Sequence, residues 1–224
     1  MVKHKTETDP LTGLLSRKTF EALFTSTFDE AKSKQRPLSL SFLDIDDFKK
    51  INDALGDAAG DSTIIRVADT IRALTGRDTI SGRYGGDEFA ILFPSTEREQ
   101  AFLALERIRS EIEKLQTIEV QGQQLNMKVS ISGGVAAYPI DGRNEREILR
   151  NADQAIYRAK GTGRNKICLS HEERMVTKTT HYTPTQLERL AKLSHDLNVG
   201  EADLLREAMD DLLIKYEVTD PFSR

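Results

Sequence analysis

The stretch RYGGDEFAIL, Arg83 to Leu92, joins two glycines and two acids to apolar residues that are typical of strands. Gly-Gly and Gly-Asp supply the positive φ angles of a tight turn, so the stretch predicts two antiparallel strands that meet at the glycines. A hairpin turn needs nothing further. The neighbouring carboxylates of Asp87 and Glu88 therefore raise a second interpretation, in which the turn holds acids in place for chemistry.

The composition predicts a globular protein with a sizeable core and no membrane span. Of 224 residues, 38% are hydrophobic and 30% are charged, and no apolar run has the length of a transmembrane helix. The start, MVKHKTETDP, lacks the apolar core of a signal peptide, and the single cysteine, Cys168, excludes an internal disulfide. A net charge of −4 does not favour nucleic-acid binding by the whole chain, and the four histidines lack zinc-ligand spacing. We expect a cytoplasmic protein.

Hydrophobic periodicity predicts alternating helices and strands up to about residue 170. Helical spacing begins at Ser16, at about Asp61, after Thr96 and before Ile148. The strand-like segments are LSLSFLDIDDF (38–48), TISGRY (79–84), FAILFP (89–94), a hairpin within 118–132 that turns near Gly122, and KICLS (166–170). The order α-β-α-β-β-α-β-β-α-β predicts an α+β fold, an α/β sandwich of about 160 residues.

The composition changes after Leu169. Residues 170–183 are polar, and two short amphipathic segments follow, with apolar positions from Leu187 to Leu197 and from Leu204 to Tyr216. We place a boundary near residue 172, which gives domains of residues 1–171 and 172–224. The second domain is too short for an independent core, so we expect it to self-associate.

The acids fall in two groups along the chain. Asp44, Asp46 and Asp47 lie at the end of one predicted strand, and Asp87 and Glu88 lie at the turn between two others. If these strands are neighbours, the carboxylates meet at one sheet edge and raise one another's pKa values unless a cation neutralises them. Their oxygens suit Mg²⁺ or Mn²⁺, and two such ions activate a hydroxyl and stabilise a leaving pyrophosphate. A solvated acidic turn explains the same spacing, which leaves both interpretations open.

Five motifs, in order, resemble those of the GGDEF family, the diguanylate cyclases. RYGGDEF carries the family signature. The other four are DPLTGLLSR (9–17), FLDIDDFKKINDALGDAAGD (42–61), SISGGVA (130–136) and ADQAIYRAKGTGRN (152–165). Ser16 stands where the family usually has asparagine, and Asp57 stands where it usually has histidine. The resemblance covers roughly residues 7–170.

The resemblance implies a palm-like nucleotide-cyclase fold, in which helices flank a central, mainly antiparallel sheet. It also implies the joining of two GTP molecules into cyclic di-GMP with Mg²⁺ or Mn²⁺, two ions per active site. By the same resemblance, Asp44, Glu88 and the carbonyl oxygen of Ile45 bind metal. Asp87 is expected at the reactive hydroxyl as the base and as a further ligand.

The remaining substrate contacts implied by the resemblance involve phosphate. Lys160 and Arg164 are expected to neutralise phosphate charge, the lysine as a point charge and the arginine as a fork. The backbone amides of Phe48 and Lys49 are expected at the triphosphate. Gly85 and Gly86 are expected to let backbone amides approach the ligand closely. A solvated helix end, favoured by the helix dipole, is the alternative for Lys160 and Arg164.

Guanine is the base that the resemblance implies. Asn52 and Asp61 are expected to hydrogen-bond its edge, because an aspartate accepts from the N1–H and the exocyclic amine together. Adenine offers no matching pair of donors, so Asp61 favours GTP. The alternative for Asp61 is the N-cap of the helix that follows it.

One departure from the family concerns inhibition by the product. Many members carry an R-x-x-D site before the signature, whereas this chain reads LTGRDTISG, with Arg77 directly before Asp78. If Asp78 is the matching acid, Thr75 replaces the arginine. We therefore predict weak or absent inhibition by cyclic di-GMP. Asp57, in place of the usual histidine, adds negative charge near the site.

The C-terminal segment resembles the ribbon-helix-helix family. Residues 177–183 alternate as a short strand does, and Thr183, Pro184 and Gln186 form a helix start. A generic helical hairpin is the alternative. Because the candidate ribbon carries little positive charge, we expect homodimerisation rather than DNA binding. The function classes left open are an active cyclase, a nucleotide-responsive DNA-binding regulator and a non-catalytic sensor of GTP or cyclic di-GMP.

Overall fold

The computed structural model describes residues 7–120, 122–170, 180, 182–197, 200–201, 204–205, 208, 212 and 215–216. Contacts within the chain divide it into two units, Met1–Arg174 and Met175–Arg224. None of the described helices is both long enough and apolar enough to cross a membrane.

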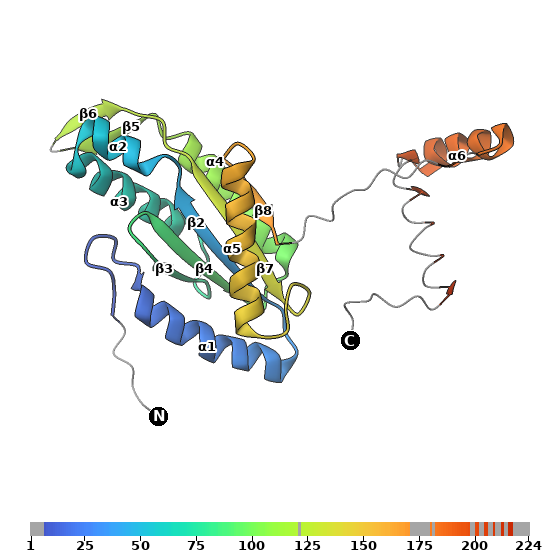
Figure 1. Cartoon of the computed structure of the whole chain (residues 1–224), viewed down its shortest axis with the longest axis horizontal. Coiled ribbons are helices and arrows are strands. Elements are labelled where there is room, and N and C mark those ends of the chain that lie inside the picture. Colours follow the sequence, from blue (N-terminus) through green and yellow to red (C-terminus); the bar gives the residue numbers. More distant parts are fainter. Residues whose placement is uncertain are drawn as a thin grey trace. The chain divides into compact units, whose positions relative to one another are not determined.

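The first unit is built on a six-stranded sheet with the order β1-β3-β4-β2-β7-β8 (Figure 1). The inner pairs are antiparallel, and the two outer pairs, β1–β3 and β7–β8, are parallel. A separate hairpin, β5–β6, turns at Gly122, where φ is 81°. The strands are β1 (Leu15–Ser16), β2 (Leu38–Ile45), β3 (Ile80–Arg83), β4 (Glu88–Pro94), β5 (Thr117–Val120), β6 (Gln123–Asn126), β7 (Ile131–Tyr138) and β8 (Ile167–Leu169).

Helices cover both faces of the sheet and enclose two hydrophobic clusters. The helices of this unit are α1 (Arg17–Lys34), α2 (Phe48–Leu55), α3 (Asp57–Leu74), α4 (Arg98–Glu113) and α5 (Glu145–Gly161). Residues of α1 and α5 pack with Leu38 and Leu40 on one face, and residues of α2, α3 and α4 pack with Leu43 and Ile45 on the other. Alternate side chains of β2 therefore pack on opposite faces of the sheet, and both faces of this strand are buried. The predicted α+β sandwich with a mainly antiparallel sheet is confirmed.

The helix expected from about Asp61 is longer than predicted and has a short helix before it. α2 ends at Gly56, whose φ of 83° and ψ of 166° break the helix, and α3 begins at Asp57. Helix α2 was not predicted from the sequence, although Phe48, Ile51 and Leu55 have helical spacing, because the helix has only eight residues and follows a strand directly. The interpretation of Asp61 as a helix N-cap is wrong, because Gly56 occupies that position.

Gly134 allows α5 to lie directly on the sheet. A Cβ atom at this position would lie 2.2 Å from the backbone nitrogen of Ile156 and 2.4 Å from the carbonyl oxygen of Ala152. The buried residues of α5 on this side include Ala152, Ala155 and Ala159, which also have short side chains. Backbone thus packs on backbone, and this contact sets the height of α5 above β7.

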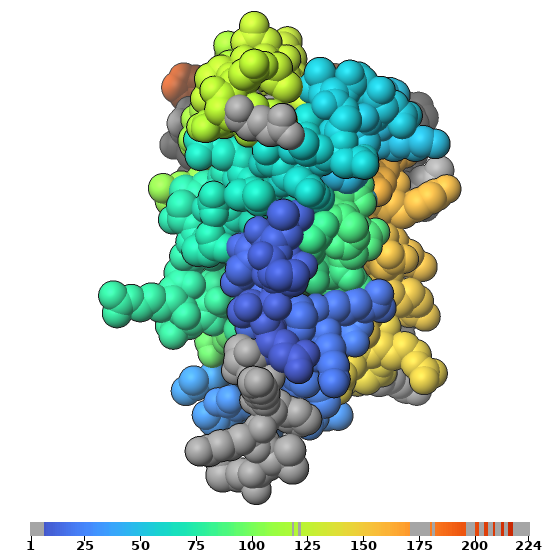
Figure 2. Space-filling model, turned by 90° about the vertical axis from the view of Figure 1, so that its left-hand side faces the viewer, coloured from blue at the N-terminus to red at the C-terminus, as the bar shows by residue number. Residues whose placement is uncertain are grey.

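The N-terminal turn packs against the first edge of the sheet. Thr12 donates to Asp9 Oδ1 through its backbone nitrogen at 2.8 Å and through its hydroxyl at 2.7 Å. Arg83 Nη1 lies 3.3 Å from Asp9 Oδ2. Burial raises the pKa of Asp9, but the hydrogen bonds from Thr12 and the charge of Arg83 outweigh burial and lower the pKa. Figure 2 shows this N-terminal region, in dark blue, seated against the teal and green segments that follow it in the fold.

The described part of the second unit is mainly α6 (Pro184–Leu197). Its start matches the sequence prediction: Gln186 N donates to Thr183 Oγ1 at 3.3 Å, and Thr183 N donates to Gln186 Oε1 at 2.9 Å. Most of the predicted strand at 177–183 lies outside the described residues, although Thr180 and Tyr182 are described and lie in no strand. Leu187 and Leu193 of α6 are each 47% exposed, so α6 presents apolar surface to solvent.

Candidate active site

Two acidic segments meet at one edge of the sheet. Asp44, near the end of β2, pairs across the ladder with Glu88, the first residue of β4. The backbone nitrogen of Ile45 donates to the carbonyl oxygen of Asp87 at 3.2 Å. The two strands are therefore neighbours, and the glycine turn brings its acids to the end of β2.

Asp44 has the most perturbed environment among these acids. Its side chain is 7% exposed, and Lys160 Nζ of α5 lies 2.7 Å from its Oδ2. Burial raises the pKa of Asp44 to about 6; Lys160 opposes this shift, and the charges of Asp87 and Glu88 add to it. A buried carboxyl with two acidic neighbours favours further positive charge at the same place.

The donors at this edge fit a hard divalent cation. Among the described residues, no three or more His, Cys, Asp or Glu side chains lie close enough to hold a metal ion by themselves. A cation at Asp44 and Glu88 would therefore need additional oxygens, such as the Ile45 carbonyl, water or substrate phosphate. Mg²⁺ commonly binds in this way, with one or two carboxylates and phosphate oxygens.

The turn between β3 and β4 is closed by hydrogen bonds that leave one glycine open. Arg83 donates to the carbonyl oxygen of Gly86 through Nε at 3.1 Å and Nη2 at 2.7 Å. A Cβ on Gly85 would lie 2.5 Å from Glu88 Oε2, whereas a Cβ on Gly86 would meet nothing within 4 Å. Gly85 thus gives room to the Glu88 carboxylate, and Gly86 leaves space for a ligand beside the turn.

The start of α2 offers backbone N–H groups next to the acids. Its N-cap, Asp47, has φ 54° and makes no side-chain capping bond. Asp47 Oδ1 instead lies 3.1 Å from Lys50 Nζ and 3.9 Å from Arg164 Nε. The backbone nitrogens of Phe48 and Lys49 are therefore left without a capping side chain, an arrangement that attracts anions.

Asn52 and Asp61 lie on the two helices that follow. The Oδ1 atom of Asn52 is buried and has no hydrogen-bond partner among the described residues. A Cβ on Gly60 would lie 1.9 Å from this oxygen, so the glycine makes room for the Asn52 amide. Asp61 follows Gly60 in α3 and is exposed. An unpaired buried acceptor is costly unless a ligand donates to it.

The two predicted phosphate-binding cations come from the end of α5 and the turn after it. Lys160 reaches Asp44 and is therefore not a freely solvated helix end. Arg164 has φ 61°, and its side chain is 50% exposed. Lys160 faces Asp44 and Arg164 faces Asp47, two acids at the end of β2, which supports a shared role at this site.

Asp46 has a different role from its neighbours. The sequence grouped it with Asp44 and Asp47, but its buried carboxylate accepts hydrogen bonds from Ser130 Oγ at 2.7 Å and Ser132 Oγ at 2.6 Å. It also accepts from the backbone nitrogen of Asn165 at 3.0 Å. No signal in the sequence indicated this separation, because strand alternation places Asp44 and Asp46 on the same face and spacing does not show which acid a serine will bind.

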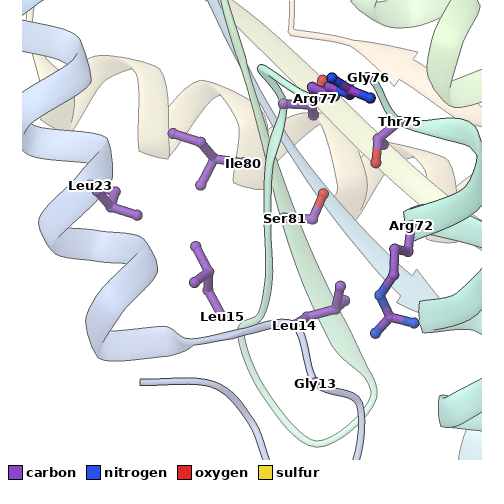
Figure 3. A pocket seen from close by; sticks show the side chains of 11 residues that line it. Gly13, Leu14, Leu15, Leu23, Arg72, Thr75, Gly76, Arg77, Ile80 and Ser81 are labelled. Atoms are coloured by element: carbon purple, nitrogen blue, oxygen red, sulfur yellow. The ribbon is translucent and has the colours of Figure 1, made fainter. Parts of the chain in front are cut away.

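A separate hollow of about 430 Å³ lies beside the loop at residues 75–79, where the family's R-x-x-D site would fall (Figure 3). Leu14 and Leu15 line it on one side, and Arg72 comes from the end of α3. The loop after α3 adds Thr75, Gly76, Arg77 and Thr79; Asp78 is not among the lining residues. The hollow therefore presents arginine without the paired acid of an R-x-x-D site.

Comparisons with known proteins find matches for both units. Residues 6–166 match the family model described as diguanylate cyclase, GGDEF domain, and residues 175–217 match that of the ribbon-helix-helix domain. Diguanylate cyclase A of Treponema denticola is 36% identical over 168 residues, which make up 74% of this chain and 44% of that protein. Cyclic di-GMP phosphodiesterase NbdA of Pseudomonas aeruginosa is 34% identical over 157 residues, or 70% of this chain and 20% of that protein. The matched region thus spans less than half of each of these two relatives.

A solved structure gives the same result for the fold. The crystal structure of the GGDEF domain of DgcB from Caulobacter crescentus, in complex with c-di-GMP, superposes with a TM-score of 0.70 at 31% identity. The match covers 76% of this chain and 99% of that one. The first unit therefore has the fold of that domain.

Proposed function

This chain belongs to the GGDEF-domain family, and on that premise we propose that it is a diguanylate cyclase. It would join two GTP molecules into cyclic di-GMP and release two pyrophosphates. The observation that carries the proposal is the meeting of Asp44, Glu88 and Lys160 at one sheet edge, with Asp44 and Glu88 paired across the ladder. A merely solvated acidic turn does not need a buried aspartate paired with a lysine from a distant helix.

The acids provide the reaction centre. Asp44, Glu88 and the Ile45 carbonyl would hold Mg²⁺ or Mn²⁺, two ions per active site, which supply charge stabilisation for the attacking and leaving oxygens. Asp87 would accept the proton of the 3′-hydroxyl that attacks the α-phosphate. A carboxylate beside a cation stays ionised, so Asp87 would act mainly through its position.

The surrounding groups would bind the nucleotide. Lys160 and Arg164 would contact phosphate oxygens, and the N–H groups of Phe48 and Lys49 would receive the triphosphate at the start of α2. Gly85 and Gly86 would allow close backbone approach. The Oδ1 of Asn52 and the carboxylate of Asp61 would accept from the guanine edge, which would satisfy the unpaired Asn52 oxygen.

The product contains two nucleotides, so two catalytic units must face each other. We propose that residues 172–224 form a homodimerisation module that brings residues 1–171 of two chains together. The ribbon-helix-helix match and the exposed leucines of α6 support this role. The cytoplasm remains the expected compartment, on the basis of the single cysteine.

The direct test is incubation of the full chain with GTP or ATP and Mg²⁺, followed by chromatography of the products. We expect cyclic di-GMP from GTP and no cyclic product from ATP alone. Asp87→Ala should remove activity. Asp61→Ala should weaken selection of GTP over ATP. A wild-type chain that binds GTP but forms no cyclic product would support the non-catalytic sensor instead.

A DNA-binding regulator is the second candidate, and the ribbon-helix-helix match is the observation that favours it. In such a protein, nucleotide chemistry would control operator binding by the C-terminal module. Gel shifts with promoter fragments, with and without cyclic di-GMP, distinguish the two roles. Specific shifts that respond to cyclic di-GMP would favour the regulator, and no shift at physiological salt would favour dimerisation alone.

A further inference from the structure

The turn between α5 and β8 is held by α4, a helix on the opposite face of the sheet from α5. Arg109 Nη1 donates to Asn165 Oδ1 at 2.9 Å, and Asn165 Nδ2 donates to Glu113 Oε1 at 2.7 Å. Arg109 Nη1 also donates to Glu113 Oε2 at 2.9 Å, which closes a triangle of three side chains. We call Arg109, Glu113 and Asn165 the α4 clamp.

The turn needs outside support because its backbone is strained. Arg164 has φ 61° and Asn165 has φ 47°, so two successive residues lie in the left-handed region. A Cβ atom disfavours this region, although asparagine and aspartate tolerate it better than other residues. Contacts elsewhere in the fold must therefore hold Arg164 in its conformation.

A second anchor fixes the backbone of Asn165. Its N–H donates to Asp46 Oδ2 at 3.0 Å, and the two hydroxyls of Ser130 and Ser132 complete the bonding of the same carboxylate. Asp46 itself is 7% exposed. The side chain of Asn165 is thus tied to α4, while its backbone is tied to the segment directly after β2.

Arg109 also connects to the strand beyond the turn. Its Nε donates to Glu106 Oε2 at 2.9 Å, and Glu106 Oε1 accepts from the backbone nitrogen of Ile167, the first residue of β8, at 3.1 Å. The side chain of Arg109 is 16% exposed, so these bonds are partly shielded from water. The amide of Asn165 and then the guanidinium of Arg109 lower the pKa of Glu113, which keeps that carboxylate ionised.

We propose that the α4 clamp is a positioning device for nucleotide phosphate. By fixing Asn165, it fixes the neighbouring Arg164 and the end of α5 that carries Lys160, so that both cations face the acids at the end of β2. The proposal rests on the proposed function of this site. Arg109 and Glu113 lie outside the five motifs that mark the family resemblance, so no motif pointed to this role.

The competing explanation is that these bonds only stabilise the fold. A structural role lowers the melting temperature and the amount of active protein but leaves the KM for GTP unchanged. A positioning role raises KM and weakens nucleotide binding, because Lys160 and Arg164 contact phosphate in the ground state as well. The split between KM and kcat therefore separates the two explanations.

The test exchanges the amide and the carboxylate between positions 165 and 113. Asn165→Asp sets a carboxylate against Glu113 and removes the donor, while aspartate still tolerates the left-handed backbone. In the double variant Asn165→Asp with Glu113→Gln, the new amide at position 113 can donate to the new carboxylate at position 165. The net charge of the α4 clamp is then the same as in the wild type. Glu113→Gln alone completes the double-mutant cycle. Glu111→Gln is the matched control, because Glu111 pairs with Lys114 of the same helical segment and not with the clamp.

The measurements are KM and kcat for cyclic di-GMP formation, melting temperature, and affinity for a fluorescent GTP analogue in Ca²⁺. For Asn165→Asp we expect KM and the dissociation constant to rise about tenfold, as for other residues that orient a ligand-binding group. The double variant should recover most of this loss, and the control should match wild type. Recovery in the double variant also excludes simple repulsion between the introduced carboxylate and phosphate, since that carboxylate is still present.

Two results would overturn the proposal: an unchanged KM and dissociation constant in Asn165→Asp, or no recovery in a double variant that melts like wild type. Failure of the proposed function has a different signature. A wild-type chain that makes no cyclic di-GMP but binds the analogue would refute the cyclase, while the binding comparison still decides the role of Asn165. Absence of binding in all the proteins would refute both.

Discussion

Gly60 is the residue on which the proposed guanine site depends most directly. Its missing side chain leaves room for Asn52 Oδ1, which would lie 1.9 Å from a Cβ, and for the ring of Phe48, which would lie 3.0 Å away. Gly60→Ala should therefore turn the Asn52 amide out of place. We expect KM for GTP to rise by roughly tenfold, the effect of one lost hydrogen bond in a binding site.

The comparison variant is Gly76→Ala, because its new Cβ would meet only Thr79 Oγ1, at 3.9 Å. Steady-state kinetics with GTP and ATP measure both the loss of affinity and the loss of discrimination. Equal KM values for wild type and Gly60→Ala would mean that Asn52 does not contact the base.

Asp44 carries a stability cost that depends on pH. Its pKa in the folded protein is about 6, mainly because of burial, whereas an unfolded aspartate titrates near 4. The folded state binds the proton more tightly, so the cost is absent below pH 4, grows between pH 4 and 6, and is complete above pH 6. Two pKa units correspond to about 3 kcal/mol.

Asp44→Asn should therefore make the metal-free protein more stable above pH 6, by up to about 3 kcal/mol, while it removes activity. Urea unfolding in the presence of a chelator, at several pH values, measures the difference. The two proteins should converge as the pH falls toward 4. A variant that is less stable than wild type at pH 8 would show that the ion pair with Lys160 outweighs burial.

Individual residues also show which parts of the candidate site could be predicted from the sequence. The meeting of the two acidic segments was predicted on the condition that their strands are neighbours, and the register that pairs Asp44 with Glu88 came only from the structure. The position of Asp61 inside α3 did not follow, since an aspartate before an apolar run has the same pattern as an N-cap. The role of Asp46 was also hidden, because its partners Ser130 and Ser132 come from a segment far along the chain.

At the scale of elements, the height of α5 above the sheet is set at Gly134. A Cβ there would meet backbone atoms of Ile156 and Ala152, which cannot rotate away. Gly134→Ala should push α5 outward, lower stability by about 1–3 kcal/mol and move Lys160 away from Asp44. We expect a lower kcat/KM together with a lower melting temperature.

The neighbouring glycine provides the control for this prediction. The two closest contacts of a Cβ on Gly133 would be the side-chain ends of Leu43 and Ile167, and the nearest backbone atom would be the carbonyl oxygen of Phe42, at 3.2 Å. Side-chain ends can move, so Gly133→Ala should cost less activity at a similar loss of stability. If both variants lose activity equally, the approach of α5 to the strand is not what positions Lys160.

The prediction of weak product inhibition rests on the residues of the loop between α3 and β3. If Asp78 is the acid of an R-x-x-D site, Thr75 stands in place of the arginine; Thr75 and Arg77 line the hollow beside this loop, and Asp78 does not. We expect weak or absent inhibition in initial-rate assays with added cyclic di-GMP. Noncompetitive inhibition at submicromolar product would contradict this expectation.

Most helices and strands were predictable because their apolar residues repeat at 3.6 or at 2 positions. The exceptions are two short elements, of two and eight residues. β1 has only two residues, and it is a strand because Leu15 and Ser16 align with Gly82 and Arg83 of a distant segment. α2 has a single buried residue, and its end depends on the backbone angles of Gly56. Long-range pairing and backbone geometry, rather than composition, decided these elements.

At the scale of the whole molecule, the two units differ in how well their apolar residues are buried. The buried hydrophobic residues described in the first unit run from Leu14 to Cys168. In the second unit, Leu204 is buried, but Leu205 and Leu212 are exposed. The proposed homodimer would cover this apolar surface with a second copy and would also bring two catalytic units together.

A truncated protein that ends at residue 172 should therefore be monomeric at concentrations where the full chain is dimeric. Its specific activity should fall steeply on dilution, because two catalytic units must then meet by diffusion, whereas tethered units have an effective concentration of about 1 mM. Light scattering and activity over a dilution series measure both effects. Replacing residues 173–224 with a dimeric coiled coil should restore activity if association is what was lost. A truncated protein that is as dimeric and as active as the full chain at low concentration would exclude the C-terminal unit as the dimerisation module.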